Sequence, residues 1–349
     1  MRFTHALRGF AVAVLAAAGP LAVPGTAHAV TFVPCSPAAL ITAIDNANAA
    51  GGDSLVLAAN CTYTLTTVDN SDSGSPNGLP VIEENISITG VNSTIQRSSA
   101  GGTPEFRIFQ IEPPDGNLTL TGVTIRGGDV TSTSDFGGGI WLHEGGTLRV
   151  VNSTLTSNRA DSGGAIDNDG GAVTVQNTTL SSNTATSFGG AMDMDGGTAA
   201  FTNVRIIGNT AQNDNGGGIW QSGTLTLTNT VISGNTAGDT GGGLRNTETA
   251  TLTNVTLDHN TADDGGGISN GDSLTTTNTR ITDNTATNEG GGLNNNGTAT
   301  LRTTLITRNS AGDGGGIFND DVVTLVGGSV VANTPNNCAP PGSVPGCIG

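Results

Sequence analysis

A repeat of about 25 residues constrains this chain more than any other feature. The pattern Gly-Gly-x-apolar recurs in a regular series of eight, at spacings of 26, 26, 27, 25, 24, 25 and 24 residues. Its apolar residues are Ile140, Ile166, Met192, Ile219, Leu244, Ile268, Leu293 and Ile317. An asparagine three residues after an apolar side chain keeps the same spacing, at Asn158, Asn183, Asn209, Asn235, Asn260, Asn284, Asn309 and Asn333. These two patterns repeat with the same period, which indicates stacked units. A single unit of this size can bury its apolar face only against its neighbours.

Each unit has the alternation of a β-strand. Leu225, Leu227 and Asn229 are separated by threonines, and no unit has a helical spacing of apolar residues. At roughly 3.3 Å per residue, one turn has too small a perimeter for an open lumen, so side chains must fill the interior. The sequence therefore predicts an all-β fold, a right-handed parallel β-helix, because crossovers between parallel strands are right-handed.

The repeated asparagines and glycines are expected to be structural. A buried amide without a partner costs about 1–3 kcal/mol, whereas stacked amides hydrogen-bond along the stack. We expect the same ladder from a second series, Asn152, Asn177, Asn203, Asn229, Asn254 and Asn278. The glycine corners predict tight turns with positive φ, since the chain has no G-x-x-x-x-G-K-[ST] motif that would cradle phosphate.

The first 29 residues have the features of a secretory signal peptide. They have a basic start, a short apolar stretch over residues 10–18 and an A-x-A cleavage site at Ala27-His28-Ala29. No long apolar run follows that would span a membrane. We therefore expect a secreted, extracellular protein.

The remaining chain divides into three predicted parts. Residues 30–52 form an N-terminal cap with a short helix, which would cover the unpaired strand edges at the end of the stack. Residues 53–333 form the β-helix of about ten coils, and residues 334–349 form a tail that contains cysteines.

The four cysteines have one feasible pairing in such a solenoid. Ten coils of about 4.8 Å place the two ends about 45–50 Å apart, whereas bridged Cα atoms lie within about 7 Å. Only the disulfides Cys35–Cys61 and Cys338–Cys347 meet this limit, and both fit an oxidising compartment. A zinc site is disfavoured because no C-x-x-C spacing occurs.

The net charge of the chain limits the classes of molecule that it can bind. The chain has 12 Arg, no Lys and 29 Asp and Glu, which give a formal charge of −17. Removal of residues 1–29 takes away two Arg and no acid, so the mature charge is 10 − 29 = −19. This charge opposes binding to nucleic acid and to anionic membrane surfaces.

Two segments carry a family resemblance. The segment from Cys35 to Asn48, with Gly52 to Leu57 and Tyr63-Thr64-Leu65 after it, resembles the CSLREA-type N-terminal segment of secreted bacterial right-handed β-helix proteins. Val123 to Gly128 and the repeats resemble those of polymorphic outer-membrane, adhesin-like proteins. In this chain Pro37-Ala38-Ala39 replaces the charged part of the CSLREA motif. The resemblance implies the fold but not an activity, because β-helices also include pectate lyases and polygalacturonases.

The candidate site follows from the alternation of the strands. If the apolar residue of each Gly-Gly-x-apolar pattern points inward, the first and third residues after it point outward. On four consecutive coils these are Trp141 and His143, Asp167 and Asp169, Asp193 and Asp195, and Trp220 and Ser222. The only two Trp of the chain thus bracket four stacked Asp, and Glu144 lies beside them.

Several chemistries fit this patch. Carboxylates about 5 Å apart across coils and about 7 Å apart along a strand overlap the separations in glycosidases, and they could also hold calcium. Crowded carboxylates raise a pKa, as a general acid requires, and Trp stacks on sugar rings. Arg126 and Arg149 could contact an acidic sugar, whereas His259 has no Ser or Cys partner for a catalytic triad. The alternative is a solvated acidic face without a function of its own.

Three hypotheses remain open. The first is a secreted monomer that binds extracellular polysaccharide or a cell-surface glycan, with Ca²⁺ as a candidate cofactor. Its binding residues would be Trp141, His143, Glu144 and Trp220. The second is a polysaccharide lyase or glycoside hydrolase whose catalytic residues are Asp167, Asp169, Asp193 and Asp195, the same side chains that could bind calcium. The third is a purely structural surface repeat.

Overall fold

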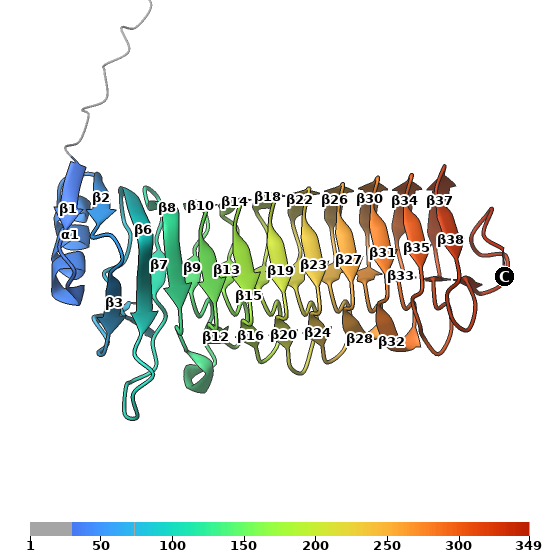
Figure 1. Cartoon of the computed structure of the whole chain (residues 1–349), viewed down its shortest axis with the longest axis horizontal. Helices are drawn as coiled ribbons and strands as arrows, with labels where there is room; N and C mark the ends of the chain where they lie inside the picture. The colour runs from blue at the N-terminus through green and yellow to red at the C-terminus, as the bar shows by residue number, and fades with distance from the viewer. Residues whose placement is uncertain (1–29, 73, 349) are drawn as a thin grey trace, which may run out of the picture.

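The chain forms an elongated β-solenoid of about 12 turns with one short helix at its N-terminal end (Figure 1). The computed structural model describes residues 30–72 and 74–348. The predicted fold class is confirmed. The predicted number of about ten coils is too low, because the first turns lack the Gly-Gly-x-apolar motif that marks the later ones.

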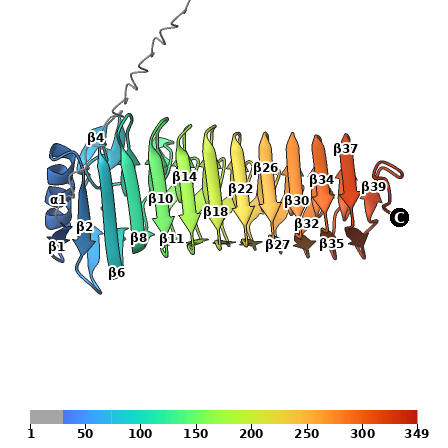
Figure 2. The ribbon, with the colours of Figure 1, turned by 90° about the horizontal axis from the view of Figure 1, so that it is seen from above.

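Most turns contribute two strands to a parallel sheet of 21 strands, called sheet 1 here. In the view of Figure 2 the first strands of successive turns lie side by side along the molecule. The strands of its N-terminal part are β1 (Val30–Val33), β2 (Asp53–Leu57), β3 (Thr62–Leu65), β6 (Asn85–Arg97), β8 (Asn117–Arg126), β10 (Thr147–Val151), β11 (Thr154–Thr156), β14 (Ala172–Gln176), β15 (Thr179–Ser181), β18 (Thr198–Thr202) and β19 (Arg205–Ile207). Those of its C-terminal part are β22 (Thr224–Thr228), β23 (Val231–Ser233), β26 (Thr249–Thr253), β27 (Thr256–Asp258), β30 (Ser273–Thr277), β31 (Arg280–Thr282), β34 (Thr298–Arg302), β35 (Leu305–Thr307), β37 (Val322–Val326) and β38 (Ser329–Val331).

Two further parallel sheets close the turns. Sheet 2 has six short strands, which are β12 (Arg159–Ala160), β16 (Thr184–Ala185), β20 (Thr210–Ala211), β24 (Thr236–Ala237), β28 (Thr261–Asp264) and β32 (Thr285–Glu289). Sheet 3 has ten strands, which are β7 (Phe109–Ile111), β9 (Ile140–Leu142), β13 (Ile166–Asn168), β17 (Met192–Met194), β21 (Ile219–Gln221), β25 (Leu244–Asn246), β29 (Ile268–Asn270), β33 (Leu293–Asn295), β36 (Ile317–Asn319) and β39 (Cys338–Ala339). A small hairpin, β4 (Asn70–Asp72) and β5 (Ser75–Asn77), and a 3-10 turn, η1 (Thr131–Thr133), project from the stack.

The helix α1 (Pro37–Ala49) lies at the end of the stack, as predicted for a cap (Figure 1). It buries Leu40 and Ile44 against the first strands, while Ile41 is half-buried. The disulfide Cys35–Cys61 joins the segment before this helix to the first turns, with a Cα–Cα distance of 5.7 Å. The second predicted disulfide, Cys338–Cys347, is also present in the C-terminal tail, at 6.3 Å. Both disulfides fit an oxidising compartment.

The interior confirms one predicted asparagine ladder. Each Asn of the series that begins at Asn158 is buried, and up to Asn309 its Nδ2 and backbone N–H both donate to Oδ1 of the Asn in the next turn. Asn183 Nδ2 also donates to the carbonyl of Leu155, at 3.1 Å. These bonds satisfy the amides inside the stack, so the ladder stabilises it instead of leaving polar groups unpaired.

The second predicted ladder lies outside the core. Asn152, Asn229 and their equivalents are exposed or half-buried and have φ near +50°, at the bend between the two strands of each turn. Three pairs of them hydrogen-bond along the stack, Asn203 to Asn177, Asn254 to Asn229 and Asn278 to Asn254. Asparagine is used here because it tolerates the left-handed conformation that the bend requires.

A third ladder was not predicted. It runs through the buried amides of Gln221, Asn246, Asn270, Asn295 and Asn319, on the inner face of sheet 3. Its members lie two residues after the apolar residue of the repeat, a column that the sequence also displays.

The predicted signal peptide, residues 1–29, lies outside the described residues. Within residues 30–72 and 74–348, no helix has the length and apolar character needed to cross a membrane.

Candidate functional site

The predicted row of side chains is present on the outward face of sheet 3. Strand register pairs Trp141 with Asp167, Asp167 with Asp193, and Asp193 with Trp220. Four consecutive turns therefore place these residues in the predicted order. Asp169 and Asp195 follow on the exposed turns after the strands.

Two of the four carboxyls differ from the prediction of a solvated patch. Asp167 and Asp193 point outward but are only 6% and 7% exposed. The glycine corners fold back over the strands, so that a Cβ added at Gly163 would lie 2.7 Å from Cβ of Asp167. The alternation rule gives the direction of a side chain, but the corner decides how much water reaches it.

A pocket of about 150 Å³ opens over these residues. It is lined by Phe136, Trp141, Asp167, Asp169, Asp193 and Asp195, and we call it the acidic pocket. Phe136 and Trp141 form its aromatic wall, with ring centroids 5.8 Å apart. Two buried polar atoms of the lining residues have no hydrogen-bond partner within the described chain, Nε1 of Trp141 and Oδ1 of Asp193.

The two buried carboxyls both have raised pKa values. Asp167 and Asp193 are paired in register on the neighbouring strands β13 and β17. Burial raises the pKa of Asp193 to about 7, with a further contribution from Asp195. Burial, with the nearby charge of Asp193, raises the pKa of Asp167 well above its usual range. At neutral pH this pair therefore carries an acidic proton, and its titration belongs to both residues together.

Arg107 lies behind the aromatic wall and is fully buried. Its Nη2 forms an ion pair with Asp135 at 2.8 Å, and its guanidinium lies 4.5 Å from the Trp141 ring centroid. Burial lowers the pKa of Arg107 to about 10, which still leaves it charged at neutral pH. The cation fixes the Trp141 ring and draws the pKa of Asp167 downward, against the effect of burial.

The other predicted binding residues lie beside the acidic pocket and do not line it. His143 stacks on Trp141 at 3.8 Å, and its Nε2 lies 3.1 Å from Glu112 Oε1. Glu144 is exposed on the following turn, and Trp220 packs on Phe188 with ring centroids 5.4 Å apart.

The two arginines and the histidine considered in the sequence analysis lie outside the acidic pocket. Arg149 donates to Gln176 at 2.7 Å, and Arg126 lines a different pocket, so neither belongs to the acidic pocket. His259 is an exposed residue whose Nδ1 lies 3.0 Å from its neighbour Asp258.

The carboxyls do not fit a calcium site in this arrangement. Within the described residues, no group of three or more His, Cys, Asp or Glu side chains is placed to hold a metal. The calcium prediction gains no support from the geometry.

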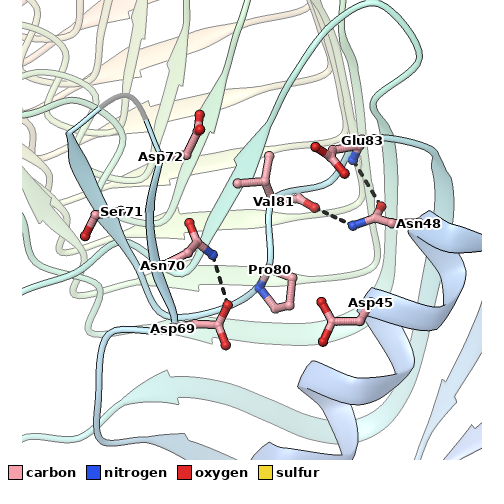
Figure 3. A pocket seen from close by; sticks show the side chains of 9 residues that line it. All are labelled: Asp45, Asn48, Asp69, Asn70, Ser71, Asp72, Pro80, Val81 and Glu83. Atoms are coloured by element: carbon pink, nitrogen blue, oxygen red, sulfur yellow. Dashed lines mark hydrogen bonds between the residues drawn. The ribbon is translucent and has the colours of Figure 1, made fainter.

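A second acidic pocket lies between the cap helix and the β4–β5 hairpin (Figure 3). Asp45 faces Asp69 across it, and burial, with the charge of Asp69, raises the pKa of Asp45. Asn48 closes the pocket by donating to the Val81 carbonyl at 2.7 Å and accepting from the Glu83 N–H at 3.1 Å. These bonds fasten the helix to the first turns and give the pocket a structural explanation.

Comparison with known proteins gives similarity in fold only. No family model and no curated protein matches the chain. A solved pectate lyase is 14% identical, with a TM-score of 0.48, over 88% of this chain and 80% of that chain. The A-module of a mannuronan C-5 epimerase from Azotobacter vinelandii is 14% identical, with a TM-score of 0.29, over 87% of this chain and 95% of that chain. The resemblance to CSLREA-type and adhesin-like proteins stays a prediction.

Proposed function

We propose that the protein binds an extracellular polysaccharide along sheet 3, with one sugar unit held in the acidic pocket. The observation that carries the proposal is the pair of unpartnered atoms on the pocket-lining residues, the Trp141 N–H and Asp193 Oδ1. A buried donor and acceptor without partners are costly, and a sugar hydroxyl both donates and accepts. The aromatic wall of Trp141 and Phe136 supplies an apolar face for the sugar ring.

Co-sedimentation with pectin, polygalacturonate, xylan, cellulose and chitin, with and without calcium, tests this proposal. Trp141→Phe removes the N–H and keeps an aromatic ring, so we expect binding to weaken by about tenfold. Trp220→Phe is the matched control, because Trp220 lies outside the pocket lining, and it should bind like the unmodified protein. Equal binding by the Trp141→Phe variant would refute the proposed site.

Glycoside hydrolysis is the second candidate function, and the raised pKa of Asp193 favours it. A carboxyl whose pKa is raised to about 7 by burial, as for Asp193, can act as a general acid near neutral pH. Asp195 lies two residues further on, in the turn after strand β17, and two residues of extended chain span about 7 Å, which is within the range of inverting glycosidases. The lining contains no Arg, His or Lys that would abstract a proton, which favours hydrolysis over lyase chemistry.

Release of reducing ends from the same glycans separates the two functions. A hydrolase should lose turnover in Asp193→Asn while it keeps its binding, because Asn cannot donate the acidic proton. Binding without any product would support the polysaccharide-binding function alone.

A further inference from the structure

Another pocket, of about 330 Å³, is lined mainly by basic side chains, in contrast to the two acidic pockets described above. It lies where strands of sheet 1 end and sheet 2 begins, and Arg97, Arg126 and Arg159 line it from three successive turns. We call it the arginine pocket. Asp129 is its one acidic lining residue, so the charged side chains sum to 3 − 1 = +2, in a chain whose formal charge is −17.

One of these arginines is held in place by the protein. Arg97 Nε donates to the Pro104 carbonyl at 2.7 Å and its Nη2 donates to the Thr103 carbonyl at 2.9 Å. Its guanidinium also lies 5.7 Å from the centroid of the Phe106 ring. The Arg97 side chain is therefore preorganised, with Nη1 making no hydrogen bond within the described residues.

The other two arginines have no partner of their own. Across residues 30–72 and 74–348, the side chains of Arg126 and Arg159 form no hydrogen bond or ion pair. Among the described residues Asp129 forms no ion pair with either arginine, and its Oδ1 accepts from the Thr131 hydroxyl at 2.8 Å. Arg107 and Arg308, in contrast, are ion-paired within the fold.

The remaining lining residues supply hydroxyl and amide groups, from Gln96, Ser98, Ser99 and Ser157. Guanidinium groups pair with planar carboxylates, while hydroxyl and amide groups match the hydroxyls of a sugar. No aromatic residue lines the pocket, so it offers no surface on which a nucleobase would stack. A long polyanion would also be repelled by the acidic remainder of the chain.

From these contacts we infer that the arginine pocket binds a single acidic sugar unit of an otherwise neutral glycan, with its carboxylate between Arg126 and Arg159. This inference does not depend on the acidic pocket, which is lined by other residues.

Saturation-transfer NMR tests the inference with a disaccharide of one uronate and one neutral sugar, and with its methyl ester. We expect the uronate to bind, the ester to bind at least tenfold more weakly, and Arg126→Ala or Arg159→Ala to cause a similar loss. Arg205→Ala is the control, because Arg205 is also exposed but lies outside this pocket. Trp141→Phe should leave uronate binding unchanged, which separates this test from that of the acidic pocket.

Two results would overturn the inference. Equal binding of acid and ester, or unchanged binding by both arginine variants, would show that the arginines do not hold a carboxylate. Inorganic sulfate that binds as tightly as the uronate would show that the pocket recognises charge alone and no sugar.

Discussion

At the scale of the residue, the environment of two aspartates separates this sheet face from an ordinary acidic surface. Asp167 and Asp193 are buried under the glycine corners, whereas Asp169 and Asp195 are exposed. Burial in a low dielectric disfavours the charged form of a carboxyl, so the buried pair keeps a proton that the unfolded chain would release. The same four side chains thus include both a proton donor and exposed carboxyls.

We expect Asp193→Asn to stabilise the fold at pH 7. The pKa of Asp193 is raised from 3.8 to about 7 by burial, so between these values the folded chain binds a proton that the unfolded chain has lost. Stability therefore falls as pH rises through this window, and Asn, which mimics the neutral acid, removes up to about 4 kcal/mol of this cost at pH 7.

Urea denaturation of both proteins from pH 4 to pH 8 measures this effect. Asp195→Asn, which changes an exposed carboxyl in the turn after the same strand, is the control. Parallel curves of unfolding free energy against pH for Asp193→Asn and the unmodified protein would contradict the raised pKa.

At the scale of the element, the turns that carry the repeat depend on a glycine corner and on a buried asparagine. The corner needs positive φ, as at Gly163 (+64°), and in sheet 3 it also determines how deeply the next side chain is covered. The buried asparagine of one turn hydrogen-bonds to that of the next turn through both its side-chain amide and its backbone N–H, as Asn183 does to Asn209.

Gly163→Ala should disturb the acidic pocket and not only the backbone. Its Cβ would lie 2.5 Å from the Ile166 carbonyl oxygen, so strand β13 must shift. Gly234→Ala is the matched control, because Gly234 has the same φ of +64° with nothing within 4 Å of the added Cβ. We expect the control to lose about 1 kcal/mol from backbone strain and Gly163→Ala to lose more and to bind glycan more weakly. Equal losses in thermal denaturation would contradict this account.

Asn235→Ala should be among the more damaging polar substitutions. It removes the acceptor for both the N–H and the Nδ2 of Asn209, at 2.9 and 3.0 Å, inside the core. Leaving these donors unpaired costs about 3 kcal/mol or more. Asn229→Gly keeps the left-handed bend of an outer ladder position and should change stability by less than about 1 kcal/mol. The two urea midpoints test the difference, and similar midpoints would be evidence against the inner ladder.

At the scale of the whole molecule, the sequence predicted the repeating architecture, the cap helix and the two disulfides, but not how deeply individual side chains are buried. The period of Gly-Gly-x-apolar predicted the solenoid, and the alternation predicted the row from Trp141 to Trp220. The burial of Asp167 was not predicted, because it depends on how a corner folds over a strand. Arg107 was missed because its turn lacks the motif and its partner, Asp135, has no equivalent position in other turns.

Net charge should make long polyuronates poor ligands at low ionic strength. The chain carries a formal charge of −17, and its repulsion of a polyanion is screened over about 10 Å at 0.1 M salt. We expect polygalacturonate to bind more tightly as salt is raised from 10 to 150 mM, approximate values at which the screening length falls from about 30 to about 8 Å. Neutral xylan fragments should show little change. Tighter polyuronate binding at low salt would show that the arginine pocket outweighs the net charge.

Fluorescence of the two tryptophans tests the central claim most directly, because the chain contains only Trp141 and Trp220. In Trp220→Phe the emission comes from Trp141 in the acidic pocket, and in Trp141→Phe it comes from Trp220 outside the pocket lining. Titration with a disaccharide from the glycan that co-sediments should change the emission of Trp141 in a saturable way and leave Trp220 unaffected. A response from Trp220 alone, or from neither residue while the disaccharide binds, would place the sugar elsewhere and contradict the proposed site.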